Sequence, residues 1–490
     1  MAQSGVKLRR ELNIWETIGI SVALMAPSMA ANINPQGMVG SVGGAIPLTF
    51  ILATVGVLLV SYTFVRLCQA YHHSGSVYGF VGATLGPKTG VVAGWALLGT
   101  YTFYGAVTAM AFGRIFSSFL DGIGVWSSPP DGAAFLLAAI ALIGVWWLTV
   151  SPVRRGTRTL LVAEVTTVAL ILIVALIILV RIASGNAPNG QPFTFSPFTV
   201  SSGTATSALF LGVVFGFLSF AGFEAAATLG EEAREPRRDI PRAILGTAIF
   251  GGVYYVFVTW IEVMGFGNTD AGLSKFGSSL SLMGDLGNEF VGNWAGDLIS
   301  LGAAVSAFAC CLACCVGASR LLYALSRDGV GPAPLATVSP KRGTPVPASG
   351  AVILGVYVII LVFKVVFGAD SLTVFLYSGV IGTLILLVAY ALATVGAMKL
   401  LFHSGRITRP RWEEAIPVLA LLVLAYTLYR NVVPYPSTDP STGLFWLPII
   451  CGVWLLAAVV FVLARPAVAR RAGGKLTEEE GLRATAGERA

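Results

Sequence analysis

Residues 14–36 read IWETIGISVALMAPSMAANINPQ, and residues 206–229 read TSALFLGVVFGFLSFAGFEAAATL. Both runs are long and apolar enough to cross about 30 Å of hydrocarbon, yet each is interrupted near its middle. Pro27 removes a backbone hydrogen bond from the first run, and Gly222 lies beside the carboxyl group of Glu224 in the second. Interrupted spans at matching places in two halves indicate a carrier's binding site, because freed N–H and C=O groups survive in a bilayer only beside protein, water or ligand.

The rest of the chain also has the composition of a membrane protein. Its 490 residues are 56% hydrophobic and 11% charged, whereas about a quarter of the residues of a soluble chain are charged. The connections between the apolar runs are too short for a soluble domain. We predict an all-α protein with about twelve transmembrane helices, at residues 14–36, 45–66, 91–119, 134–150, 159–182, 206–229, 243–265, 295–325, 346–368, 372–398, 412–430 and 443–464.

The positions of Lys and Arg predict the orientation of these spans. With both termini inside, nearly all of the 31 basic residues fall in cytoplasmic segments, and Arg181, Lys275 and Arg430 fall outside. The net charge of +7 therefore reflects topology and not nucleic-acid binding. We expect a multi-pass protein of the cytoplasmic (inner) membrane with cytoplasmic termini. Residues 1–13 form the N-terminal segment, and the polar tail at 465–490 has so little to bury that we expect it to be disordered.

The sequence argues against several other classes of protein. It has no Gly-Lys-Ser/Thr phosphate loop for ATP-driven transport, and no spaced His or carboxylate set that indicates an enzyme or a cofactor. Four of the six cysteines occur at helical spacing in one span, which raises the possibility of a metal site. Small residues for close helix packing are the simpler interpretation, and we predict no metal. These cysteines are Cys310, Cys311, Cys314 and Cys315.

Three stretches resemble the amino acid-polyamine-organocation permeases: SYTFVRLCQAYHHSGSVYGFVGATLGP (61–87), GFLSFAGFEAAATLGEEAREPRRDIPRAI (216–244) and ASRLLYALSRDGVGPAPLATVSPKRGTP (318–345). The resemblance covers most of the chain. It implies the leucine-transporter fold of two inverted five-helix repeats plus two C-terminal helices. The transmembrane domain at 14–464 then divides into a first repeat at 14–182, a second at 206–398 and the last two helices at 412–464.

The resemblance also implies a substrate site near the bilayer midplane, against the unwound stretches of the first and sixth helices. Tyr101 and Tyr104 on the third helix are further candidates, with packing as the alternative. Phe220 resembles the aromatic residue that closes over substrate in relatives, and the alternative is that it faces lipid or packs in the core. The implied residues of the unwound stretches are Ala26, Pro27, Ser28, Met29, Leu218, Ser219, Phe220, Ala221 and Gly222.

The first helix departs from the family pattern at its break. Many amino acid carriers of the family have a Gly-Ser-Gly-like turn whose N–H groups bind the substrate carboxylate, and here the turn reads Ala26-Pro27-Ser28. Pro27 has no N–H to donate. The hydroxyl of Ser28 and the N–H groups of Ser28 and Met29 remain, so carboxylate recognition is weakened and an amine or polyamine substrate becomes more plausible.

Ionisable residues inside spans are functional candidates because they are costly to place there. We expect Glu224 to bind a proton or pair with a substrate ammonium, or else to accept structural hydrogen bonds. Glu164 is a second candidate for proton coupling, with pairing to nearby arginines as the alternative. Some family members couple to protons through a Lys in the fifth helix. The comparable stretch here, residues 160–176, contains no Lys, so the sequence does not support coupling by this route. Three residues toward helix ends are expected to anchor at the interface by snorkelling: Arg114, Lys364 and Glu262.

The sequence thus predicts a secondary active transporter for amino acids or related organic amines that works by alternating access, with co-transported H⁺ or by exchange. A carrier specific for polyamines or amines, or an inorganic-cation importer of the same fold, is the alternative within transport. A non-transporting sensor or a channel is the alternative outside it. The expected partners are a small-molecule substrate, the lipid bilayer and H⁺, with no nucleic acid and no cofactor.

Overall fold

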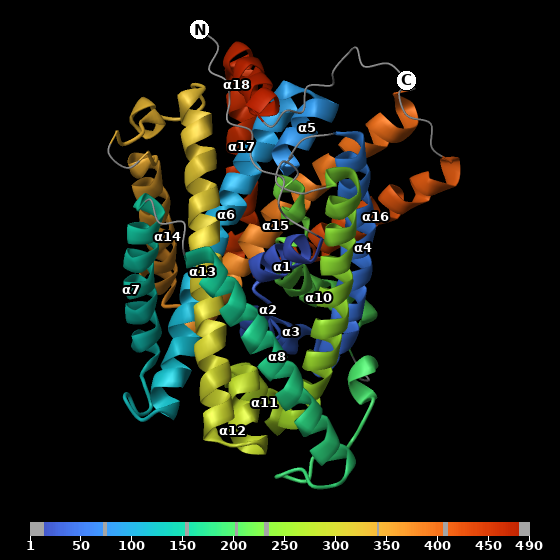
Figure 1. Cartoon of the computed structure of the whole chain (residues 1–490), viewed down its shortest axis with the longest axis vertical. Coiled ribbons are helices and arrows are strands. Elements are labelled where there is room, and N and C mark those ends of the chain that lie inside the picture. Colours follow the sequence, from blue (N-terminus) through green and yellow to red (C-terminus); the bar gives the residue numbers. More distant parts are fainter. Residues whose placement is uncertain are drawn as a thin grey trace.

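The computed structural model describes residues 14–71, 76–151, 156–200, 204–229, 235–340, 343–404 and 410–479. These residues form helices and connecting loops without a β-strand. The first half comprises α1 (Ile14–Met25), α2 (Pro27–Ile33), α3 (Gln36–Val42), α4 (Ile46–Ala70), α5 (Val77–Leu85), α6 (Pro87–Gly122), α7 (Asp131–Val150) and α8 (Gly156–Ala183). Figure 1 shows them gathered into one bundle with the later helices.

The second half repeats the alternation of long spans and short pieces. It comprises α9 (Leu209–Phe220), the 3₁₀ helix η3 (Phe223–Leu229), α10 (Pro236–Phe266), α11 (Asp270–Ser278), α12 (Leu282–Phe290), α13 (Asn293–Arg327), α14 (Val346–Phe367), α15 (Ser371–Met398), α16 (Ala415–Arg430), α17 (Gly443–Ala464) and α18 (Pro466–Glu479). Short helical turns lie at Ser196–Phe198, Thr206–Ala208, Ala333–Ala336, Lys399–His403 and Arg411–Glu414.

Eleven helical segments of the described chain are long and apolar enough to cross a membrane. The remaining predicted span, at 14–36, is present as α1 and α2, which are separated at Ala26 and are each too short to cross alone. The structure therefore confirms a polytopic all-α protein, and the chain is a multi-pass membrane protein.

The long helix α6 lies at the centre of the packing. It runs against α13 and α15, and it also contacts α7, α14 and α17. A second group packs α10 against α4 and α1, with α9 against α4. Helices α11 and α12 lie at one end of the bundle, and α5 and α18 lie at the opposite end (Figure 1).

The C-terminal tail departs from the sequence prediction. Residues 466–479 form α18, which packs against α5 and α6, and residues 480–490 lie outside the described part of the chain. Ala469 and Ala472 are buried, and a side chain at Gly473 would meet the backbone of Pro87. Lys475 Nζ lies 3.0 Å from Asp328 Oδ1. Small residues on one face and an ion pair at its end hold this otherwise polar helix in place.

Candidate functional site

The first broken helix turns at Ala26, whose φ of 49° and ψ of 54° lie in the left-handed region. Non-glycine residues adopt this conformation uncommonly, and such residues often mark functional sites. α1 ends at Met25, and α2 restarts with Pro27 at its first position, where the missing N–H costs nothing. The break therefore follows from the sequence Ala26-Pro27 and exposes backbone groups in the interior of the bundle.

The carboxyl group of Glu164 on α8 fills this break. Its Oε1 atom accepts hydrogen bonds from Ser28 N at 2.9 Å and from Ser28 Oγ at 2.6 Å. Glu164 is only 4% exposed. On the other side of the break, the Tyr254 hydroxyl donates to the carbonyl oxygen of Pro27 at 3.4 Å. Side chains of α8 and α10 thus satisfy the polar groups that the break releases.

The arginine pairing considered for Glu164 falls on groups that the structure does not describe. Arg154 and Arg155 lie outside the described residues, as does the side chain of Arg158. Among the described groups, Glu164 bonds to Ser28, a residue predicted for the substrate site. The structure therefore brings together two candidate residues that are 136 positions apart.

The second broken helix turns at Ala221 and Gly222. α9 ends at Phe220, Gly222 has a φ of 102°, and the chain resumes as η3. Glycine adopts such positive φ angles at little cost. The turn leaves Ala221 and Gly222 partly exposed in the middle of the bundle, whereas Leu218, Ser219 and Phe220 are buried.

Hydrogen bonds connect the two broken helices. The Asn34 amide, just after α2, donates to Ser219 Oγ at 2.8 Å. The Tyr255 hydroxyl donates to the carbonyl oxygen of Ser219, also at 2.8 Å, and its ring packs edge-on against that of Phe220. Phe220 is fully buried, so it does not face lipid. Asn34 and Tyr255 could not be predicted from the sequence, because their roles depend on tertiary contacts.

A cluster of one carboxyl group and three tyrosines lies beside the second break. It consists of Glu224 on η3, Tyr390 on α15, and Tyr101 and Tyr104 on α6, whose side-chain groups interact electrostatically with one another. Glu224 Oε2 and the Tyr390 hydroxyl are buried and interact with each other, and neither has a hydrogen bond to another described group. Buried polar atoms usually satisfy their full bonding capacity, so a pair that has only each other indicates a position for a ligand.

Tyr104, another member of this carboxyl–tyrosine cluster, is anchored by a neighbouring helix. The Tyr104 hydroxyl lies 3.0 Å from Thr383 Oγ1 on α15. Tyr101 and the nearby Cys310 of α13 are partly exposed within the bundle. Tyr390 was not predicted as a site residue. The feature of the sequence that could have indicated it is an aromatic hydroxyl in the middle of an otherwise apolar span.

The cysteines of α13 contribute to packing. The Cys311 thiol lies 3.6 Å from the carbonyl oxygen of Gly105 on α6, and none of the six cysteines, all in the described part of the chain, forms a disulfide. Cys315 also lies close to Gly105. These contacts place the thiols at the crossing of α6 and α13, where small side chains let the two helices approach.

Three side chains hold α11 and α12 against the bundle, and we call them the clasp: Asn32, Gln36 and Arg114. Asn32 Oδ1 accepts hydrogen bonds from Ser281 Oγ at 2.9 Å, Met283 N at 3.0 Å and Gly284 N at 3.3 Å. Gln36 Nε2 donates to the carbonyl oxygens of Phe276 and Ser279. Arg114 donates to the Ser279 carbonyl oxygen at 3.0 Å and to Ser371 Oγ at 2.8 Å. These buried bonds close the α11–α12 end of the bundle.

The burial of Arg114 corrects the expectation that it snorkels to the interface. Arg114 is 5% exposed and belongs to the clasp, and Glu262 is fully buried. Lys364 is more exposed and lies 3.7 Å from Asp131. Two of the three expected anchors therefore point into the protein, because helix packing and not position along the span decides where a side chain lies.

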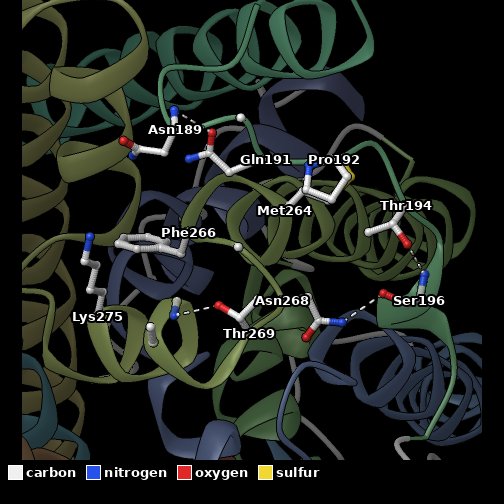
Figure 2. Close-up of a pocket in the computed structure, with 14 residues that line it drawn as sticks. Asn189, Gln191, Pro192, Thr194, Ser196, Met264, Phe266, Asn268, Thr269 and Lys275 are labelled. Carbon is white, nitrogen blue, oxygen red and sulfur yellow. Dashed lines mark hydrogen bonds between the residues drawn. The ribbon is translucent and has the colours of Figure 1, made fainter. Parts of the chain in front are cut away.

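A separate pocket lies at the same end of the bundle and has a volume of about 460 Å³. Figure 2 shows it between the loop at 189–196 and the connection from α10 to α11, with Lys275 at one side. Asn268 Nδ2 donates to Ser196 Oγ, and Gly272 N donates to Thr269 Oγ1 on its wall. None of the residues predicted for the substrate site lines this pocket.

Comparisons with known proteins agree with this architecture. Residues 12–456 match a family model described as "Amino acid permease". The branched-chain amino acid permease BcaP of Bacillus subtilis is 26% identical over 358 residues, which cover 70% of this chain and 73% of that protein. The low-affinity putrescine importer PlaP of Escherichia coli is 25% identical over 350 residues, which cover 70% of this chain and 72% of that protein.

A mammalian relative and a solved structure extend the comparison. The large neutral amino acids transporter small subunit 2 of Oryctolagus cuniculus is 26% identical, covering 92% of this chain and 79% of its own. The crystal structure of a manganese transporter from Eremococcus coleocola has a TM-score of 0.56 at 14% identity, and covers 96% of this chain and 100% of that one. This last similarity shows the fold alone.

Proposed function

Because the chain belongs to the amino acid permease family, we propose that it moves an amino acid or a related organic amine across the membrane by alternating access. The relatives named above are permeases or importers of branched-chain amino acids, putrescine and large neutral amino acids. Transport of an unchanged small molecule fits a chain in which two broken helices meet in the bundle interior. No enzymatic activity is part of this proposal.

The proposed location is the cytoplasmic (inner) membrane, with both termini in the cytoplasm. The distribution of Lys and Arg supports this orientation. The α11–α12 end then faces outward, and the α5–α18 end faces the cytoplasm. In this orientation the clasp closes the outer side, so the structure represents a conformation that is shut toward the exterior.

The observation that carries the proposal is the pair formed by Glu224 and Tyr390 in the carboxyl–tyrosine cluster. Glu224 Oε2 and the Tyr390 hydroxyl interact with each other and bond to no other described group, while Ala221 and Gly222 beside them are partly exposed. A substrate ammonium carries three donors and would satisfy both atoms. The rings of Tyr101 and Tyr104 would add cation–π attraction. Packing is the alternative role for both tyrosines, and the bond from Tyr104 to Thr383 fits that role for Tyr104.

The proposed energy source is a proton gradient or exchange with a second substrate. Glu224 and Glu164 are the candidate proton carriers, because each is a carboxyl group beside one of the two helix breaks. A proton on Glu224 would compete with the substrate ammonium for the same oxygen atom. Proton binding and substrate binding would then be linked at one side chain.

Uptake by the purified protein in proteoliposomes tests this proposal. We expect saturable accumulation of a labelled amino acid or amine that responds to an imposed pH gradient. Glu224→Gln should transport with a flattened pH dependence while remaining folded, and Glu289→Gln, which changes an exposed carboxyl group on α12, should keep the wild-type profile. Unchanged uptake by Glu224→Gln at every pH would remove Glu224 from the mechanism. Flux without saturation would indicate a channel, and binding without flux would indicate a sensor.

A further inference from the structure

The first helix break has few donors left for a substrate carboxylate. Pro27 has no N–H, and the N–H of Ala30 is bonded to the carbonyl oxygen of Ala26. Both donors of Ser28, its N–H and its hydroxyl, are bonded to Glu164 Oε1. The protein therefore brings its own carboxyl group to both donors of Ser28, and of the donors expected at this turn only the N–H of Met29 remains outside this pairing.

Displacing Glu164 would be unfavourable. A substrate carboxylate that took over these donors would leave the Glu164 carboxyl group buried without them. The side chain of Glu164 is almost fully buried, so water could not compensate for this loss.

The ionisable groups beside the two breaks are carboxyl and hydroxyl groups and not basic ones. Among the described residues, the groups that act on Glu164 and Glu224 are hydroxyl and backbone groups, and include no Lys, Arg or His. Arg114, the basic residue buried on α6, is engaged with Ser279 and Ser371 in the clasp. The described side chains beside the two breaks thus offer acceptors and carboxyl groups for a cation, and no basic group for an anion.

From this arrangement we propose that the transported substrate is an organic amine without an α-carboxylate, and that Glu164 excludes amino acids by occupying both donors of Ser28. This inference rests on the proposed transport function and narrows its substrate class. It assigns Glu164 a role in specificity that is separate from carrying a proton.

Matched pairs of ligands test the inference in the wild-type protein. Each pair contains an amine and the same molecule with an α-carboxylate: putrescine and ornithine, cadaverine and lysine, and isoamylamine and leucine. Binding is measured by thermal stabilisation and by competition with a labelled amine. In any pair of which a member binds, we expect the amine to bind at least about tenfold more tightly than the amino acid. Equal or tighter binding of the amino acid would overturn the inference but leave the transport function intact.

Variants of Glu164 separate the proposed cause from other sources of selectivity. Glu164→Ala frees both donors of Ser28, so we expect the preference within a pair to shrink by about tenfold through a gain in amino acid binding. Glu164→Gln still presents an acceptor oxygen to Ser28 and should keep the preference. An unchanged ratio in folded Glu164→Ala would overturn the role of Glu164. If Glu164→Ala does not fold, the wild-type pair ratio still decides the substrate class. Failure of every ligand to bind would contradict both the transport function and this inference.

Discussion

Replacing Asn32 with Ala should open the α11–α12 end of the bundle, which we propose faces outward. Asn32 Oδ1 accepts three hydrogen bonds from the α11–α12 segment, at 2.9, 3.0 and 3.3 Å. A fourth bond, from Asn32 Nδ2 to the Ser28 carbonyl oxygen, stays within α2 and does not hold the segment closed. At about 1 kcal/mol net for each bond, the closed conformation loses about 3 kcal/mol relative to the open one. That change shifts the equilibrium by a factor on the order of 100.

Labelling of Cys310 measures this shift, because Cys310 is partly exposed within the bundle near Tyr104. In a variant that retains only this cysteine, a membrane-impermeant thiol reagent is added outside intact cells. Asn32→Ala should raise the labelling rate about 10- to 100-fold. The control Asn189→Ala removes an exposed amide that bonds to Glu289 at the same end and should leave the rate unchanged. An unchanged rate in folded Asn32→Ala would refute the reasoning that the clasp holds the outer side shut.

Two further predictions concern stability. Burial raises the pKa of the Asp285 carboxyl from 3.8 to about 6, despite a hydrogen bond from Ser279. The folded protein therefore holds this proton more tightly than the unfolded chain. Stability should therefore fall by about 3 kcal/mol as pH rises from about 4 to about 6. Melting temperatures measured over this pH range should show the fall in the wild-type protein and not in Asp285→Asn. The same pH dependence in both proteins would contradict the prediction. A Cβ at Gly113 would lie 2.1 Å from the carbonyl oxygen of Ala134, so Gly113→Ala should cost about 3 kcal/mol or more by forcing α6 and α7 apart. Gly350 has no atom within 4 Å of such a Cβ, and Gly350→Ala should be neutral or slightly stabilising; similar melting temperatures for both variants would refute the packing argument.

The fold could be predicted because its main determinants are local. Apolar runs of sufficient length specify membrane spans, and Pro27 and Gly222 interrupt two of them for reasons that need no tertiary information. The observed breaks lie where these residues place them, with the left-handed Ala26 and the positive φ of Gly222 as the hinge conformations. The resemblance of three stretches to a family supplied the order of the helices.

The site was less predictable because its contacts join distant parts of the chain. Glu164 bonds to Ser28 across the bundle, and its position along α8 could not distinguish this contact from pairing with arginines. Tyr390 meets Glu224 only after α15 packs beside η3. The buried position of Arg114 likewise depends on acceptors supplied by α11–α12 and α15.

The C-terminal tail shows that composition alone does not predict whether a segment packs against the protein. A polar segment with few large apolar residues was expected to remain disordered, yet α18 docks through Ala469 and Ala472. Small side chains bury little area, but they allow helix backbones to approach closely. The contact therefore depends on shape, which the proportion of hydrophobic residues does not describe.

Counterflow most directly tests the central claim that the chain carries its substrate by alternating access. Proteoliposomes are loaded with a high concentration of unlabelled putrescine, or of another ligand that stabilises the protein, and diluted into a trace of the labelled compound. A carrier that exposes one site alternately to each side should accumulate the label transiently above its outside concentration, and empty liposomes should not. Simple equilibration of the label, without any overshoot, would contradict the account.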